Sequence, residues 1–315
     1  MAITTGSGPS AGEDATTRER NLPPGEIVEK RAPRGRTARF FEAWPPSVLL
    51  ALGWILAMLF IAAFVEILAA YSYTAMDLRA RLTPPVFWGG TDVRHLLGTD
   101  ELGRDVLSRL LYSIRMSLLI AFFGTLIAAT LGTFLGILAA HFRGWVEDVV
   151  LMAIDFQASM PFLIIALAVL AFFGNSLILF ICLMGFHGWE RYARISRGLA
   201  ISANEQGYAG AVRQLGAPAW RIYGRHILPN IASTLIVSMT LAFPETILLE
   251  SGLSFLGLGV QPPLTSLGNM VGYGREYITR APWIMLAPSV IIILTTLSIS
   301  IVGDWLRDRL DPTLK

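Results

Sequence analysis

Long apolar runs alternate with shorter polar segments along this chain, and that alternation is its main pattern. The apolar runs carry few charges and follow a polar stretch over residues 1–46. A helix needs about 20 mostly apolar residues to cross the hydrocarbon core of a bilayer. The pattern therefore predicts an all-α membrane protein of about six transmembrane helices, at residues 47–70, 116–140, 149–173, 176–190, 231–256 and 284–303.

The polar segments between these runs predict the domain organisation. Residues 1–46 are rich in Gly, Ser, Thr, Pro and mixed charge, as in a disordered tail. They lack the short apolar core and cleavage site of a signal peptide, so the first span is expected to be an uncleaved anchor. The expected order is a tail at 1–46, a first transmembrane helix at 47–70, an outer loop region at 71–115, a core of five further spans at 116–303 that contains a polar loop at 190–230, and a second tail at 304–315.

The distribution of arginine predicts the orientation in the membrane. The N-terminal tail, the 190–230 loop and the C-terminal tail carry more Arg and Lys than the loops on the other side. Because basic loops stay in the cytoplasm, both termini are expected to be cytoplasmic. The loop at 71–115 counts least in this comparison, since five acids offset all but one of its six Arg.

Composition excludes several classes of function. The chain of 315 residues is 54% hydrophobic and 15% charged, with a mean hydropathy of +0.57, and its net charge of +2 gives no support for a nucleic-acid partner. Cys182 is the only cysteine, so no disulfide framework is expected. The only lysines, Lys30 and Lys315, do not follow a glycine-rich loop, which excludes a phosphate-binding GxxxxGK[ST] motif. The four histidines are far apart, and no metal site is expected.

A polar segment at 206–230 predicts a helical hairpin that projects from the bilayer. Gly216 is expected to end a first helix with positive φ, Pro218 suits the first turn of a second helix, and Pro229 opens the apolar run that follows. A helix lying on the membrane surface is the alternative, but the first helix has few large apolar residues for that purpose. The residues expected to face a partner are Glu205, Tyr208, Ala209, Gly210, Ala211, Val212, Leu215, Gly216 and Pro229.

Four acids fall within the expected spans, and they leave two interpretations open. A carboxylate in mid-bilayer costs about 2.5–3.5 kcal/mol, so these groups are expected to face the bundle interior or water. One interpretation is a proton relay or cation site; the other is pairing with Arg or hydrogen bonding between helices. Because the expected spans contain no Lys or Arg, structural or pore-lining roles are favoured. The acids are Glu66, near the end of its span, and the pore candidates Asp155, Glu245 and Glu250.

Two outer loops are long enough to form a platform for a docking protein. Residues 104–119 read as an amphipathic helix that runs into the second span, whereas the loop at 257–283 is rich in Gly and Pro. The alternative is that these loops only cap the bundle. The candidate docking residues are Asp100, Arg104, Asp105 and Gln261.

Four sequence blocks resemble the second, C-type permease subunit of the dipeptide/oligopeptide/nickel family of ABC importers. Three are HLLGTDELGRDVLSRLLYSIRMSL at 95–118, ESGLSFLGLGVQPPLTSLGNM at 250–270 and GDWLRDRLDP at 303–312, and the fourth is the hairpin. The family's coupling loop carries a Glu-Ala-Ala, Gly, Ile-x-Leu-Pro signature. With Gly216 on the signature glycine, the signature glutamate is absent here, because Gly210 occupies its position. The docking role is carried over to Ala211, Leu215, Gly216 and Pro229.

The resemblance implies a type I ABC importer permease in the bacterial inner membrane. Its implied partners are a homologous permease, two cytoplasmic ABC ATPases that bind ATP and Mg, an extracytoplasmic solute-binding protein and the lipid bilayer. No cofactor is expected on this chain. The cargo stays open among dipeptides, longer peptides, metal chelates, opines and glycosides. The rival hypotheses are an ion-coupled secondary transporter that uses Glu245 and Glu250, and a membrane scaffold without transport.

Overall fold

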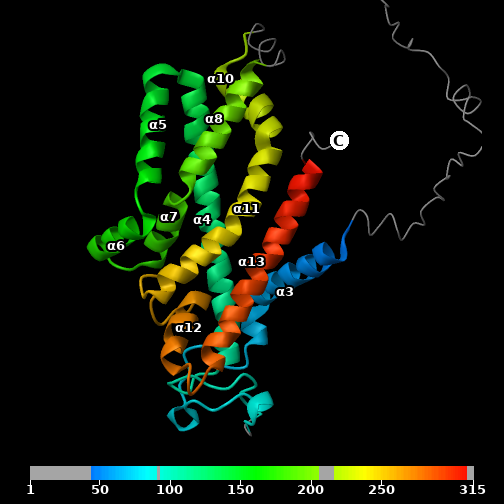
Figure 1. Ribbon diagram of the computed structural model, residues 1–315, viewed down its shortest axis with the longest axis vertical. Helices are drawn as coiled ribbons and strands as arrows, with labels where there is room; N and C mark the ends of the chain where they lie inside the picture. The colour runs from blue at the N-terminus through cyan, green and yellow to red at the C-terminus, as the bar shows by residue number, and fades with distance from the viewer. Residues whose placement is uncertain (1–43, 91–92, 206–215, 311–315) are drawn as a thin grey trace, which may run out of the picture. The chain divides into compact units, whose positions relative to one another are not determined.

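The computed structural model describes residues 44–90, 93–205 and 216–310, and these residues are mostly helical. In this part of the chain no strand forms, and Thr99 and Asp105 pair in an isolated antiparallel bridge. The all-α prediction is confirmed. The α-helices are α3 (Pro46–Leu68), α4 (Val106–Phe142), α5 (Gly144–Ser159), α6 (Phe162–Phe173), α7 (Leu177–Phe186), α8 (Trp189–Glu205), α10 (Ala219–Ile222), α11 (Leu228–Phe255), α12 (Leu267–Gly274) and α13 (Trp283–Leu310) (Figure 1). Short 3₁₀ turns lie at Leu78–Ala80, Val86–Trp88 and Arg275–Tyr277, and a π-turn lies at Tyr223–Ile227.

Fewer helices are long enough to cross a bilayer than the six expected. Four of the described helical segments qualify, namely α3, α4, α13 and the continuous segment Ala219–Phe255. A fifth is present if α5 and α6 count as one span, although they are bent by 92° at the break beside Pro161. Proline lacks the backbone N–H that continues a helix, which explains why the expected span at 149–173 is divided.

The expected fourth span, at 176–190, is also divided. The α7 helix is only 10 residues long and ends at Phe186, and α8 begins at Trp189. Gly188 between them has φ of +88°, a left-handed conformation that glycine adopts without strain. The prediction that one helix continues through this point was therefore wrong.

The long helix α4 is the centre of the packing. It contacts α3, α5, α7, α8, α11 and α12 (Figure 1). Gly132 and Gly136 face α8 so closely that a Cβ at Gly136 would overlap the carbonyl oxygen of Ala193 and the hydroxyl of Ser196. Small residues four apart let two helix backbones approach closely in a membrane. This contact holds α8 against α4.

The end of α4 near the outer loops has its own apolar core. Val106, Leu110 and Ile114 on α4 pack with Trp283 and Ile284 at the start of α13. The Trp283 indole N–H donates a hydrogen bond to the Thr99 carbonyl oxygen over 3.2 Å. The two loops expected to lie outside are thereby joined to one core.

Candidate functional site

A buried charged network, here called the outer network, holds the loop before α4. It consists of Asp100, Glu101, Arg104 and Arg109. The Asp100 carboxylate is fully buried and accepts hydrogen bonds from the backbone N–H groups of Leu102 and Arg104, each at 2.9 Å. It also accepts a bond from Arg104 Nε at 2.7 Å and another from the Arg109 guanidinium. Buried charges with this many partners hold one geometry, because removing a partner leaves a charge uncompensated.

Asp105 is likewise committed to the fold. Its side chain caps α4 by accepting a hydrogen bond from the Ser108 N–H at 2.7 Å, and its other oxygen lies 3.0 Å from Nδ1 of buried His95. Asp100 and Asp105, expected as docking residues, are therefore buried and hold the loop instead of forming its surface. Gln261 is partly exposed, and its amide donates to the carbonyl oxygens of Gly257 and Gly259.

Glu250, expected as a pore candidate, ties three helices together. Its carboxylate is fully buried and accepts hydrogen bonds from Ser117 on α4 at 3.0 Å and Ser254 on α11 at 2.7 Å. The Ser117 hydroxyl oxygen in turn accepts the backbone N–H of Leu267, the first residue of α12. This arrangement satisfies a buried carboxylate and gives it a structural position away from open space.

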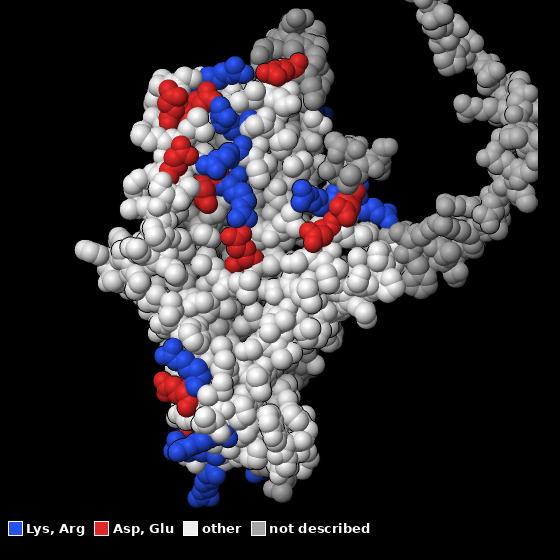
Figure 2. All heavy atoms as spheres, in the orientation of Figure 1, with Lys and Arg blue, Asp and Glu red and all other residues white. Residues whose placement is uncertain are grey.

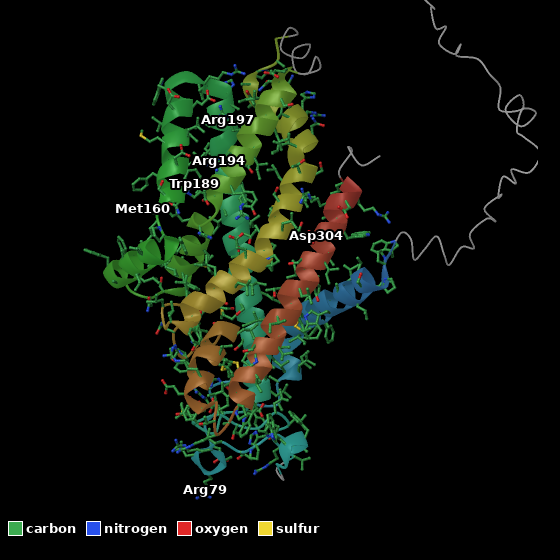
Figure 3. The ribbon with its side chains drawn as sticks, viewed as in Figure 1. Arg79, Met160, Trp189, Arg194, Arg197 and Asp304 are labelled. Carbon is green, nitrogen blue, oxygen red and sulfur yellow. The ribbon has the colours of Figure 1, made fainter. Side chains whose placement is uncertain are left out.

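Three arginines of α8 pair with acids on two other helices, forming what we call the inner ladder. Arg191 lies 2.9 Å from Glu245 on α11, Arg194 lies 3.2 Å from Asp155 on α5, and Arg197 bonds Glu147 at the start of α5, with Nε at 2.7 Å. Figure 3 shows Arg194 and Arg197 along α8 beside α5, and Figure 2 shows charged side chains gathered over these helices. Asp155 and Glu245 therefore do have cationic partners, placed just beyond the expected fourth span.

Two of the three pairs in the ladder are more exposed than the outer network, whereas the third pair, Arg197 with Glu147, is only 28% and 16% exposed. The side chains of Arg191 and Glu245 are 48% and 50% exposed, and those of Arg194 and Asp155 are 58% and 75% exposed. Exposed ion pairs contribute only about 0–1 kcal/mol, so these contacts can open at little cost.

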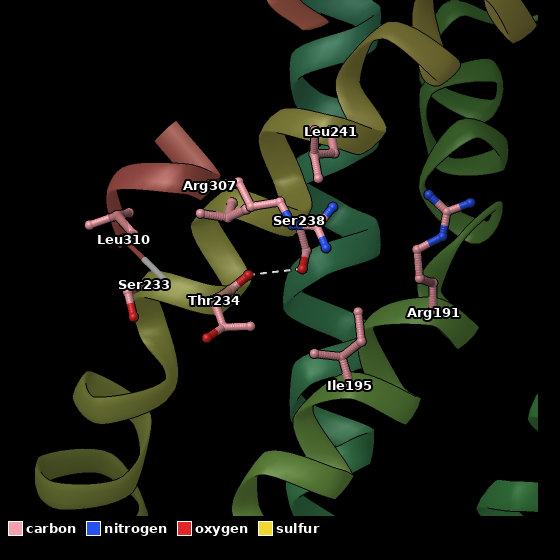
Figure 4. A pocket seen from close by; sticks show the side chains of 9 residues that line it. Arg191, Ile195, Ser233, Thr234, Ser238, Leu241, Arg307 and Leu310 are labelled. Carbon is pink, nitrogen blue, oxygen red and sulfur yellow. Dashed lines mark hydrogen bonds between the residues drawn. The ribbon is translucent and has the colours of Figure 1, made fainter. Parts of the chain in front are cut away.

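An open cavity of about 470 Å³ lies between α8, α11 and the end of α13. Hydroxyl groups of α11 and two arginines face it, and Ser238 donates a hydrogen bond to the Thr234 carbonyl oxygen within it (Figure 4). The lining residues are Arg191, Ile195, Ser233, Thr234, Val237, Ser238, Leu241, Arg307 and Leu310.

The described part of the predicted hairpin joins the helical core directly. Gly216 has φ of +78°, which confirms the predicted positive φ. The second helix starts after Pro218 and continues through the π-turn into α11, where Pro229 lies in the first turn and precedes the apolar run, as predicted. A proline ring clashes with the carbonyl four residues earlier in an α-helix, and the wider π-turn before Pro229 relieves that contact.

Side-chain contacts fix this second helix to its neighbours. The Asn204 amide near the end of α8 donates to the Tyr223 hydroxyl oxygen at 3.0 Å, and the His141 ring at the end of α4 meets Tyr223 edge to face. Ile222 and Ile227 are buried in the same apolar cluster. A displacement of the hairpin would therefore move α4, α8 and α11 together.

The remaining hairpin candidates are the last residue of α8 and residues that follow it in the sequence. Glu205 is the last residue of α8 and is exposed. Tyr208, Ala209, Gly210, Ala211, Val212 and Leu215 lie outside the described residues. Within the described ranges, no group of three or more His, Cys, Asp or Glu side chains could hold a metal ion.

Sequence reasoning missed several residues of these sites. The three-residue spacing of Arg191, Arg194 and Arg197 can be read from the sequence, but their acid partners on other helices cannot. The hydroxyl groups of Ser233, Thr234 and Ser238 recur on one side of α11, which was a usable signal. Nothing in local spacing pointed to Arg307, because it comes from a separate helix.

Comparisons with known proteins agree with this architecture. Residues 132–315 match the family described as binding-protein-dependent transport system inner membrane component. The di/tripeptide transport system permease protein DppC of Pseudomonas aeruginosa is 39% identical over 268 residues, which cover 84% of this chain and 88% of that protein. The dipeptide transport system permease protein DppC of Alkalihalophilus pseudofirmus is 33% identical, with 95% of this chain and 96% of that protein covered.

A solved structure extends the comparison to the fold. A chain of the MetNI methionine ABC transporter in inward-facing conformations matches with a TM-score of 0.50 and 19% identity, covering 65% of this chain and 96% of that chain. At this identity the match concerns the fold alone. The family match, the relatives and the several apolar helices together show that this chain belongs to the binding-protein-dependent transport system inner membrane components and is a multi-pass permease subunit of an ABC importer.

Proposed function

We propose that this chain is the second permease subunit of an importer for dipeptides, oligopeptides or a related small solute. The printed names of its relatives support this substrate class, since they include di/tripeptide, dipeptide and oligopeptide permeases. Within such an importer the chain forms half of the translocation pathway beside a homologous permease. Solute selection then lies largely with a separate extracytoplasmic binding protein, to which the outer loops dock through Gln261, Arg104 and the surface that Asp100 and Asp105 hold in place.

The hairpin is proposed to couple this chain to two separate ABC ATPases, which bind ATP and Mg. The observation that carries this proposal is the unbroken helical segment Ala219–Phe255, which begins as the second helix of the hairpin and is long enough to reach the loop at 257–283 across the membrane. The Tyr223 contacts with α8 and α4 support it further, because they give the hairpin a rigid base. ATP hydrolysis is assigned to the partners because this sequence has no phosphate-binding loop.

The proposed topology places both termini and the hairpin in the cytoplasm and residues 71–115 and 257–283 outside. The excess of arginine at the termini and on α8 supports it. In a background with the exposed Cys182 replaced by Ser, Thr91→Cys should react with a membrane-impermeant thiol reagent from outside, and Ser202→Cys should not. The reverse labelling pattern would contradict the topology.

An ion-coupled secondary transporter through Glu245 and Glu250 is less well supported. Glu245 is paired with Arg191, and Glu250 is surrounded by serine hydroxyls away from open space. Uptake driven by an ion gradient without ATP would revive that alternative.

The test of the proposed function is uptake of a radiolabelled dipeptide by the complete importer in proteoliposomes. Uptake should require ATP inside, the binding protein outside and both ATPases. Ala211→Trp should leave assembly of the two permeases intact but abolish ATP-dependent uptake, because added volume on a close-packed docking surface is poorly tolerated. Thr16→Trp in the N-terminal tail is the matched control and should transport normally. If Ala211→Trp transports at the parental rate with the normal number of ATPases bound, the coupling assignment is wrong.

A further inference from the structure

The cavity between α8, α11 and α13 has the size and the chemistry of a small-molecule site. Its volume of about 470 Å³ falls within the range of roughly 300–1,000 Å³ that is typical of ligand pockets. Its wall combines Arg191 and Arg307 with the hydroxyls of Ser233, Thr234 and Ser238 (Figure 4). A hydroxyl both donates and accepts hydrogen bonds, so this wall suits a ligand that carries amide groups and a carboxylate.

Arg191 lies between two neighbouring pockets. It lines the main cavity and also a small adjoining pocket, together with Glu245, Thr125 and Thr246. Its ion pair with Glu245 is about half exposed on both sides, so a ligand carboxylate can compete for the guanidinium. Arg307, on the other wall, brings a second guanidinium group to the cavity.

A zwitterion is the ligand that replaces this ion pair without leaving a charge unpaired. If a ligand carboxylate takes Arg191, Glu245 loses its partner, and a ligand ammonium restores the balance. A short peptide carries both groups at its ends and amide groups between them. Recognition through its ends and backbone also tolerates any side chain, as a pathway for mixed peptides requires.

We propose that this cavity, together with the adjoining pocket at Glu245, is a transient binding site for short peptides within the permease, where the peptide α-carboxylate binds Arg191 and its α-ammonium binds Glu245. The hydroxyls of Ser233, Thr234 and Ser238 bind the peptide backbone, and Arg307 attracts the carboxylate. This inference rests on the proposed function as a peptide importer, and it assigns recognition to the permease itself in addition to the binding protein.

Photo-crosslinking tests the site without the binding protein. The complete complex of permeases and ATPases, in lipid nanodiscs without nucleotide, is exposed to alanyl-photoleucine or to its C-terminal amide. Labelled positions are then mapped by mass spectrometry. The free acid should label residues 233–241 of α11 about tenfold more than the amide, as expected for loss of one charge-assisted hydrogen-bonded contact. Excess alanylalanine should compete with this labelling.

Two variants identify the groups involved. Arg191→Gln should lower labelling by the free acid about tenfold, to the level of the amide, while Arg191→Lys should keep part of it. In the parent, the probe with a free α-ammonium should label the site more strongly than an N-acetylated form of the same probe. Glu245→Gln should remove this difference. Arg194→Gln is the matched control, since Arg194 belongs to the same ladder but does not line the cavity, and its labelling should equal that of the parent.

The outcomes separate this inference from the proposed function. Equal labelling by acid and amide, or labelling by the acid that Arg191→Gln leaves unchanged, overturns the peptide site. If the parental importer takes up no peptide in proteoliposomes, the proposed function itself fails. If it takes up peptide but shows no carboxylate-dependent labelling, only this inference is lost.

Discussion

Charged side chains near the two ends of α4 and α11 differ in how deeply they are buried. At the outer end, Asp100, Arg109 and Glu250 are buried; Asp100 and Glu250 each accept several hydrogen bonds, and Arg109 pairs with Asp100. At the inner end, two of the three pairs in the ladder of α8, Arg191 with Glu245 and Arg194 with Asp155, are about half exposed or more. A buried network has one low-energy arrangement, whereas an exposed pair can exchange partners with water or a ligand. The difference indicates that the outer end is a fixed frame and the inner end is the part that rearranges.

The largest effect is expected from Asp100→Ala in the outer network. It leaves the buried Arg109 guanidinium without its carboxylate, and removing one partner of a buried pair costs about 3–5 kcal/mol. Thermal unfolding of the purified permease in detergent should show this loss. Asp77→Ala is the control, because Asp77 is exposed and only caps a short 3₁₀ turn. If Asp100→Ala unfolds at the same temperature as Asp77→Ala, the outer network does not stabilise the fold, and the outer end cannot be called a fixed frame.

The next effect concerns the contact between α4 and α8. Gly136→Val puts atoms where the Ala193 backbone and Ser196 now lie, and overpacking of this kind costs about 1–3 kcal/mol. The same unfolding assay measures it. Gly198→Ala, at an exposed position of α8 with open space around it, should be neutral or slightly stabilising. Equal stabilities of the two variants would mean that the close approach of α4 and α8 is not required.

A smaller effect is expected at the base of the hairpin. Gly216→Val must adopt φ of about +78°, and the left-handed region costs a residue with a Cβ roughly 1–2 kcal/mol. We expect weaker association with the ATPases and uptake uncoupled from hydrolysis, measured in proteoliposomes, with unchanged unfolding of the helical core. Gly224→Ala is the control, since a Cβ there meets nothing within 4 Å. Full coupling in Gly216→Val would show that this conformation does not matter for function.

The smallest effect on stability is expected in the inner ladder. Arg194→Ala removes an ion pair whose side chains are 58% and 75% exposed, so it should cost no more than about 1 kcal/mol. Unfolding in the same detergent gives the comparison with Asp100→Ala. A loss as large as that of Asp100→Ala would mean that the two ends do not differ as described.

The sequence predicted the features that depend on near neighbours along the chain. The helical class, the positive φ of Gly216 and the run of α4 from the outer loop into a span follow from composition and local spacing. The pairing of Glu245 with Arg191 does not, because the two residues are on separate helices and only the packing of α8 and α11 brings them together. The same holds for Glu250, whose serine partners come from α4 and α11. The break at Pro161 has a local cause in the proline, but the angle between α5 and α6 depends on how α6 packs.

Hydrogen–deuterium exchange of the complete importer tests the contrast between the two ends most directly. The complex is compared without nucleotide and with the ATPases trapped in their ATP-bound state. The account predicts changed exchange in α8 and in residues 228–245 of α11, where the ladder and the cavity lie, and unchanged exchange in residues 95–118 and 250–270. Equal changes at both ends, or changes confined to the outer network, would contradict a fixed outer frame with a mobile inner end.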